Sequence, residues 1–171
     1  YFAVWNEPDI GYWMPDTPLD DVQPRAQEYC RLYDFAVAGI LQADESLRVG
    51  GPEIAGPSYE NPQVDGFLKI FLDHCANGRN HVTGDVGSRL DFISMHGKGT
   101  GRLGGQVPSP NLYYLIADKA KNYMNVINQF PSFKDKRILL DEWDIDFGTH
   151  STLKSSADFA YRNNAYFAVY L

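Results

Sequence analysis

Hydrophobic residues along the chain form four short runs, and each run is followed by a longer stretch with helical periodicity. The short runs predict β-strands at residues 2–5, 47–51, 90–96 and 137–143, about 45 residues apart. Helices are predicted at residues 21–40, 64–76 and 111–130, where apolar positions recur every three or four residues, and residues 156–171 show the same pattern. The chain is therefore expected to hold four consecutive βα units.

Strands that alternate with helices indicate an α/β fold with a parallel sheet. Such a sheet is either an open doubly wound fold or a closed (β/α)8 barrel of the TIM type. Each predicted strand ends in, or is followed by, polar residues: Asn6-Glu7, Glu53, His96 with Lys98, and Asp141-Glu142. This favours the barrel, because all its βα loops open onto one face. A whole barrel needs roughly 250 residues. The 171 residues thus predict a partial barrel of four units, roughly strands 4 to 7, as one domain over residues 1–171.

A formal G-x-G-x-x-G pattern occurs at Gly99, Gly101 and Gly104. In dinucleotide-binding proteins this pattern opens a helix directly. Here Gly105-Gln106-Val107-Pro108 follows, and no helix is predicted before residue 111. We therefore interpret the segment as a surface loop and predict no cofactor.

Composition narrows the class of protein further. With 44% hydrophobic residues the chain is globular, and its net charge of -7 argues against a nucleic-acid partner, which needs a basic face. No apolar stretch approaches the ~20 residues of a membrane span. Cys30 and Cys75 lie in amphipathic helical stretches and are predicted to be buried thiols. Because residue 1 is a tyrosine inside a strand-like run, we expect a piece of a longer protein of unassigned compartment.

Glu7 and Glu142 are the candidate catalytic residues. In a closed barrel both would face one cup, where two carboxyls suit glycoside cleavage: one protonates the leaving oxygen, and the other attacks the anomeric carbon or activates water. Asn6 suits a hydrogen bond to the sugar 2-hydroxyl. Trp5, Trp13 and Trp143 offer flat surfaces for sugar rings, although core packing explains any one of them equally well. The alternative is that both glutamates are ordinary strand-end carboxylates paired with basic residues.

Two segments, WNEPD and LLDEWD, resemble the acid/base and nucleophile motifs of the clan A retaining glycosidases. The sequence between them is similar to glycoside hydrolase family 39, which contains β-xylosidases and α-L-iduronidases. Residues 47–99, including LRVGGPEIAGPS and SRLDFISMHGKG, resemble the iduronidase branch, whereas Ile10 stands where that branch has a histidine. The resemblance implies a carbohydrate substrate.

The same resemblance implies roles for individual residues. Glu7 would be the general acid/base, Glu142 the nucleophile and Asn6 a substrate contact. His96 and Lys98 would line the site, and Lys98 and the backbone of Gly148 would lie near the carboxylate of a uronic acid.

Several functions remain open at this point. The leading prediction is an exo-acting, β-xylosidase-like retaining enzyme, with an iduronidase-like uronosidase as the alternative. An inactive carbohydrate-binding fragment is a candidate of another class. A metal-dependent hydrolase is disfavoured, and no metal site is predicted, because His74, His81, His96 and His150 form no ligand motif. The edge strands of a partial barrel also predict self-association.

Overall fold

The computed structural model describes residues 1–10, 14, 16–18, 21–55, 63–98 and 112–144, with the backbone alone for residues 63–65, 98, 112–119 and 143–144. The elements in chain order are β1 (Phe2–Ala3), α1 (Val22–Ala43), β2 (Val49–Ile54), α2 (Gln63–Asn77), β3 (Phe92–Lys98), α3 (Leu112–Ile127) and β4 (Arg137–Asp144). The predicted helix at 156–171 and the G-x-G-x-x-G segment lie outside the described residues.

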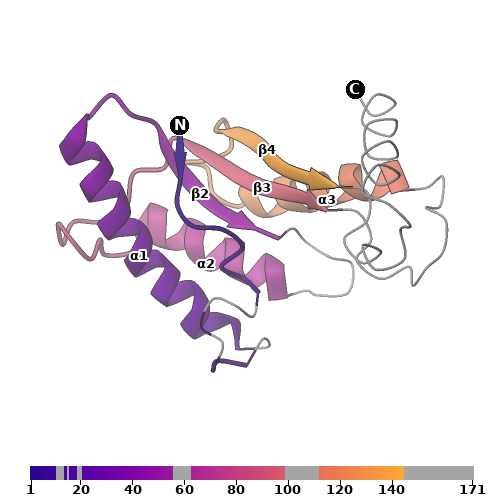
Figure 1. Cartoon of the computed structure of the whole chain (residues 1–171), viewed down its shortest axis with the longest axis horizontal. Helices are drawn as coiled ribbons and strands as arrows, with labels where there is room; N and C mark the ends of the chain where they lie inside the picture. The colour runs from indigo at the N-terminus through magenta and orange to yellow at the C-terminus, as the bar shows by residue number, and fades with distance from the viewer. Residues whose placement is uncertain (11–13, 15, 19–20, 56–62, 99–111, 145–171) are drawn as a thin grey trace, which may run out of the picture.

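The four strands form one parallel sheet in the order β1-β2-β3-β4. The sheet is curled, and the helices lie along its outer side, with α1 next to α2 and α2 next to α3 (Figure 1). Sequential strands that pair as neighbours, each joined to the next by a helix, are the repeating unit of a (β/α)8 barrel. The predicted α/β partial barrel is confirmed.

Strand β2 differs most from its predicted bounds. The sequence pattern ends this strand at residue 51, but the structure extends it through Pro52 and Glu53 to Ile54. Its pairing with β3 shifts register between Gly51 and Ile54, and this interruption accommodates a proline, which has no N–H for the ladder. Gly50 permits the close approach of the two strands, because a Cβ there would lie 2.5 Å from the Phe92 carbonyl oxygen. Because β2 extends to Ile54, Glu53 lies within the strand and not in the loop that follows it.

Aromatic side chains join α1 and α2 to the sheet. Tyr29 and Tyr33 of α1 and Phe71 of α2 are fully buried, and the rings of Tyr33 and Phe71 meet edge to face with centroids 4.9 Å apart. The Tyr29 hydroxyl donates a hydrogen bond to the Val4 carbonyl oxygen at 2.8 Å. A buried tyrosine needs such a partner for its hydroxyl. This bond fixes the backbone three residues before Glu7.

Arg25 of α1 holds the segment that follows Glu7. Its guanidinium group is buried and donates to the carbonyl oxygens of Ile10 (3.1 Å), Met14 (3.0 Å) and Pro18 (3.3 Å). It also donates to the carbonyl oxygen of Thr17. The rigid fork of donors in arginine suits this role, because one side chain satisfies several backbone acceptors at once.

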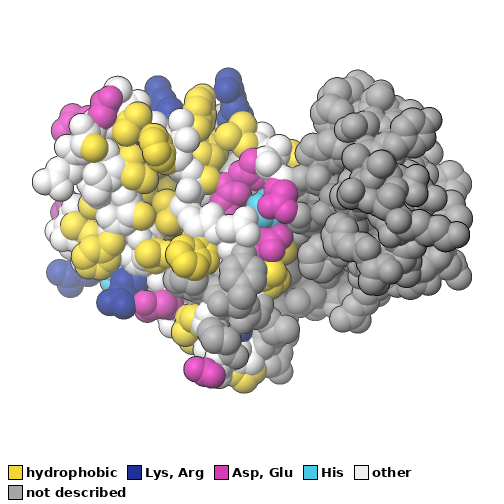
Figure 2. All heavy atoms as spheres, in the orientation of Figure 1, with side chains coloured by type: hydrophobic (Ala, Val, Ile, Leu, Met, Phe, Trp, Pro, Cys, Tyr) yellow, Lys and Arg dark blue, Asp and Glu magenta, His cyan; other side chains and the backbone are white. Residues whose placement is uncertain are grey.

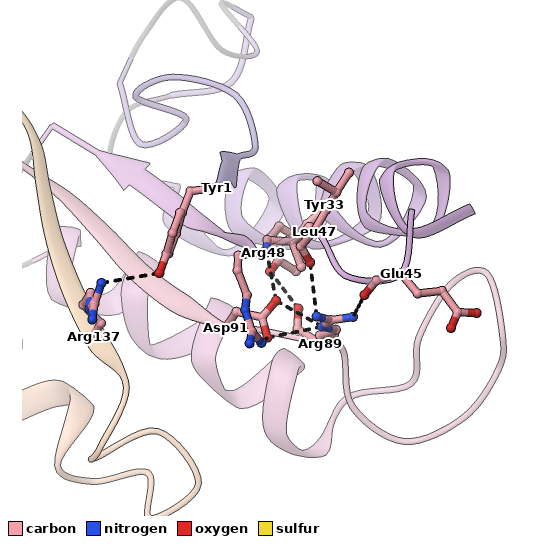
Figure 3. Close-up of polar contacts among 9 residues, drawn as sticks. Tyr1, Tyr33, Glu45, Leu47, Arg48, Arg89, Asp91 and Arg137 are labelled. Carbon is pink, nitrogen blue, oxygen red and sulfur yellow. Dashed lines mark hydrogen bonds and ion pairs between the residues drawn. The ribbon is translucent and has the colours of Figure 1, made fainter. Parts of the chain in front are cut away.

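A polar network fixes the amino ends of β2 and β3 (Figure 3). Glu53 and His96 lie toward the carboxyl ends of the same strands. Arg89 Nε lies 3.0 Å from Asp91, and its terminal nitrogens donate to the carbonyl oxygens of Glu45 (3.0 Å) and Leu47 (3.1 Å). Asp91 also accepts the backbone N–H of Val49 at 3.0 Å. Burial works to raise the pKa of Asp91, but these bonds outweigh it and lower that pKa.

Cys30 and Cys75 are buried and carry free thiols, as predicted. Burial raises the pKa of Cys30 to about 12, so the thiol stays protonated and unreactive. No helix in the described part of the chain is both long and apolar enough to cross a lipid bilayer.

Candidate active site

Charged side chains from all four strands meet at the carboxyl ends of the sheet. We call them the His96 cluster: Glu7 after β1, Glu53 in β2, His96 in β3, and Asp141 and Glu142 in β4. The register of β3 and β4 pairs His96 with Glu142, and Glu7 N–H donates to the Glu53 carbonyl oxygen at 2.8 Å. Acidic side chains gather around a histidine near the centre of the face in Figure 2. The parallel sheet thus brings together residues that are far apart in sequence.

His96 is the centre of this cluster. Its Nδ1 lies 2.9 Å from Glu7 Oε1. On the other side of the ring, Nε2 lies 3.4 Å from Glu53 Oε2, 3.8 Å from Glu142 Oε2 and 4.0 Å from Asp141 Oδ1. One imidazole therefore faces four carboxyl groups, one of them through Nδ1 and the other three through Nε2.

The members of the cluster differ in their exposure to solvent. The side chain of His96 is 1% exposed, that of Glu7 10% and that of Glu53 7%, whereas Glu142 is 46% exposed. Glu7 and Glu53 also have positive φ angles, 45° and 55°, which residues with a Cβ rarely adopt. Such backbone strain is concentrated at functional sites in proteins. The site therefore has a buried half around His96 and an accessible half at Glu142.

The carboxylates keep His96 protonated. Burial alone would lower the pKa of His96, but hydrogen bonds to Glu53 and Glu7 and the nearby Asp141 outweigh burial and raise it to about 9. At neutral pH the ring is therefore an imidazolium with N–H donors on both nitrogens. It can donate to Glu7 from Nδ1 and to Glu53 from Nε2 at the same time.

The pKa values of Glu53 and Asp141 are shifted in opposite directions. Burial raises the pKa of Asp141, and the hydrogen bond to Glu53 and the negative charge of Glu53 raise it further, to about 7. Burial also opposes ionisation of Glu53, but its hydrogen bonds with His96 and Asp141 are stronger and lower the pKa of Glu53. Near neutral pH, Glu53 is thus the carboxylate of this pair and Asp141 carries the proton for part of the time.

Asp9 adds a further acidic group beside the cluster. Its Oδ1 accepts the backbone N–H of Ala55 at 2.9 Å. Burial raises the pKa of Asp9 to about 6, and the negative charge of Glu7 acts in the same direction, while the backbone hydrogen bond and His96 oppose them. This carboxyl consequently retains its proton to a higher pH than an exposed aspartate does.

The fold brings three of the predicted site residues together: Glu7, His96 and Glu142. An oxygen of each glutamate and a ring nitrogen of His96 all lie within 4.8 Å of one another. Asn6 directly precedes Glu7 and is exposed. The two candidate catalytic carboxyls, Glu7 after β1 and Glu142 in β4, thus belong to one cluster.

The other predicted contacts are placed only in part. The backbones of Lys98 and Trp143 lie at the ends of β3 and β4, where Gly97 pairs with Trp143 and Lys98 with Asp144. Their side chains, and Gly148, lie outside the described part of the structure. Their contacts with a substrate stay predictions.

Sequence reasoning did not assign Glu53 and Asp141 to the site, although both were among the polar residues at strand ends. The available signal was position, since each follows apolar strand residues in the same way as Glu7 and Glu142. It gave no reason to select these two carboxylates, because nothing local showed that they would lie beside His96. Their role depends on distances across strands.

Groups that could hold a metal ion occur at two places among the described residues. His96 forms one group with Glu7 and Glu142 and another with Glu53 and Asp141. A metal ion could bind there only after His96 had lost its proton, because an imidazolium has no free lone pair. The second place lies away from the site, where Asp34 meets His74 and His81. The sequence showed no motif that joins these two histidines.

Comparison with known proteins identifies the family. The profile of the glycosyl hydrolases family 39 matches residues 1–170. The chain belongs to this family. It is 35% identical to the α-L-iduronidase of Mus musculus over 144 residues, which are 84% of this chain and 20% of that enzyme. A β-xylosidase of Geobacillus stearothermophilus is 34% identical over 95 residues, 56% of this chain and 15% of that enzyme. The chain spans about a fifth of the length of the first relatives that it matches.

Solved structures agree with this assignment to family 39. A bacterial orthologue of human α-L-iduronidase superposes with a TM-score of 0.65 and 27% identity, covering 88% of this chain and 22% of that chain. The fold is also shared by a family 51 α-L-arabinofuranosidase from Bifidobacterium longum, with a TM-score of 0.55 and 16% identity over 91% of this chain and 28% of that chain. The resemblance seen in the sequence motifs is confirmed at the level of the family.

Proposed function

We propose that the protein to which this chain belongs is a retaining glycosidase that cleaves O-glycosidic bonds by double displacement. Glu7 acts as the general acid/base and Glu142 as the nucleophile. Glu7 first protonates the leaving oxygen while Glu142 attacks the anomeric carbon; Glu7 then removes a proton from the water that hydrolyses the glycosyl-enzyme. Asn6 contacts the sugar 2-hydroxyl, and no cofactor takes part.

One observation carries this proposal: carboxyls from the two edge strands of the sheet, β1 and β4, approach the same histidine. Oxygens of Glu7 and Glu142 lie within 4.8 Å of each other in the His96 cluster. Two carboxyls whose oxygens come this close can both reach one sugar ring. This arrangement supports an attack by Glu142 on the anomeric carbon while Glu7 acts on the leaving oxygen. The hydrogen bond from His96 fixes the orientation of Glu7.

We infer that the substrate is a uronoside. Matches to α-L-iduronidases extend over 84% of the chain, whereas those to β-xylosidases extend over 56%. Lys98 lies at the end of β3, two residues beyond His96, where its cation would pair with a sugar carboxylate. The His96 cluster itself is acidic, so an anionic sugar needs such a cation nearby. A β-xyloside is the second candidate, favoured by the 34% identity to the Geobacillus enzyme.

The proposal is tested with the full-length protein on nitrophenyl glycosides, including an α-L-iduronide and a β-xyloside. Replacing Glu142 by alanine is expected to lower kcat on every substrate by roughly 10⁴-fold or more, because the covalent intermediate cannot form. Replacing Glu7 by alanine should spare substrates with good leaving groups and impair those with poor ones, since only the latter need a proton donor.

The matched control is Glu45→Ala, which removes an exposed glutamate from the turn before β2 and should leave kcat unchanged. Equal losses on good and poor leaving groups in Glu7→Ala would contradict the acid/base role. If the wild-type protein binds sugars and hydrolyses none of the panel, it is instead a carbohydrate-binding protein.

A further inference from the structure

We propose that Glu53 is a positioning residue of the His96 cluster, which holds the ring of His96 so that its Nδ1–H points at Glu7. No role for Glu53 follows from the two catalytic motifs. The effect on activity rests on the glycosidase function proposed above, whereas the effect on His96 does not.

The ring of His96 in β3 contacts Glu53 in β2 through one nitrogen and Glu7 after β1 through the other. Glu53 Oε2 lies 3.4 Å from Nε2 of His96, and Nδ1 on the other side of the ring lies 2.9 Å from Glu7 Oε1. A ring held by a hydrogen bond at Nδ1 and by an ion pair at Nε2 cannot rotate about its Cβ–Cγ bond without breaking one of the two contacts. Among the described carboxyls that face Nε2, Glu53 is the closest and the most buried. Glu53 is therefore the group that best fixes the ring.

Glu53 also lowers the stability of the folded protein at its position. Its side chain is 7% exposed, and its second oxygen, Oε1, is buried with no hydrogen-bond partner among the described residues. Its backbone has a φ of 55°, in the left-handed region. A buried carboxylate with an unused oxygen reduces stability, and a strained backbone reduces it further. Both features are expected of a residue retained for a site and not for the core.

The negative charge of Glu53 also stabilises the protonated form of His96. Glu7, Asp9, Glu142 and Asp141 are the other described acidic groups beside His96, which they reach from the segment after β1 and from β4. Asp141 shares its proton with Glu53 near neutral pH, because its pKa is raised to about 7. Glu53 is thus the buried anion that offsets the desolvation of the imidazolium at Nε2. Without it, the carboxylates left at Nε2 would be Asp141 at 4.0 Å and Glu142 at 3.8 Å, which are more distant and more exposed, so burial would move the pKa of His96 downward.

The test measures the pKa of His96 directly. The full-length protein is labelled at histidine, and the ring signals are followed by NMR as the pH is varied, with His96→Gln to assign the signal. In the wild type we expect a pKa of about 9. In Glu53→Gln it should fall by at least ~1 unit, while Glu53→Asp, which keeps the charge, should recover part of the difference. Glu45→Gln, the exposed control, should leave it unchanged.

Activity gives a second readout. In Glu53→Gln, kcat should fall roughly 10- to 100-fold with little change in KM, because Glu7 is misplaced while the sugar contacts remain. The basic limb of the kcat/KM profile should move to lower pH, and Glu53→Asp should restore it in part.

Two results would overturn the inference. One is a wild-type His96 pKa at or below 6.5, which needs no variant to fold. The other is an unchanged His96 pKa in a folded Glu53→Gln protein. A wild type without glycosidase activity would refute the proposed function alone, since the titration of His96 remains a complete test of the contact with Glu53.

Discussion

The strongest prediction for stability concerns Asp34, a buried carboxylate in α1 far from the His96 cluster. Its side chain is 0% exposed. Oδ2 accepts hydrogen bonds from His74 Nε2 at 3.0 Å and from the backbone N–H of His81 at 2.7 Å, and Oδ1 accepts one from the Ser88 hydroxyl. One carboxylate therefore joins α1 to the end of α2 and to the segment 78–88. We expect Asp34→Ala to release all three donors.

The size of the effect follows from these contacts. A hydrogen bond to a charged group contributes about 1.5–3 kcal/mol. The sum over three bonds is an upper limit, because removing the carboxylate also removes the cost of burying it. We expect Asp34→Ala to lower the free energy of unfolding by about 4 kcal/mol, within the range for breaking a buried charged contact. Ser88→Ala removes one donor and should cost about 1–2 kcal/mol.

The effect should also depend on pH in a defined direction. Burial opposes ionisation of Asp34, but its bonds with His74, Ser88 and His81 outweigh burial and lower its pKa below the ordinary 3.8. A lowered pKa in the folded state gives stability that is present above pH 3.8 and is lost as the pH falls through the folded-state pKa. The difference between wild type and Asp34→Ala should therefore be full at pH 7 and shrink as the pH falls below 3.8, the ordinary pKa of aspartate.

The assay is urea-induced unfolding of the full-length protein at several pH values, followed by circular dichroism. Hydrogen exchange over residues 78–88 provides a local measurement, because Ser88 N–H and Gly78 N–H bond to carbonyl oxygens of α2. Asp135→Ala, at an exposed aspartate after α3, is the matched control and should change stability by no more than ~0.5 kcal/mol. A loss in Asp34→Ala no larger than in this control, or one independent of pH, would refute the reasoning.

Two further predictions concern the substrate and the chain itself. Lys98→Ala should weaken kcat/KM for the iduronide at least ~10-fold more than for the xyloside, because only the former carries a carboxylate; an unchanged ratio removes the uronoside proposal. Residues 1–171 expressed alone should self-associate, since edge strands β1 and β4 expose Phe2 and Leu140. Light scattering should detect this, and a monomer at high concentration contradicts it.

The order of the elements was determined by local sequence patterns. Helical periodicity predicts α1 to within about three residues at each end, since an amphipathic face is a property of neighbouring residues. Apolar runs likewise locate β3 and β4 to within two residues. Strand β2 was the exception. Its extension through Pro52 depends on the register with β3, which the sequence of β2 alone does not contain.

The site residues, like the elements of the fold, were predicted from the sequence only in part. Glu7 and Glu142 could be selected from the sequence, because each follows a strand and lies in a recognisable motif. The position of His96 between them, and the participation of Glu53 and Asp141, depended on which strands pair and in which register. The protonation of the cluster depended on the tertiary structure for the same reason. The pKa of a side chain follows its burial and the charges within a few ångströms, and here those charges come from residues in different strands.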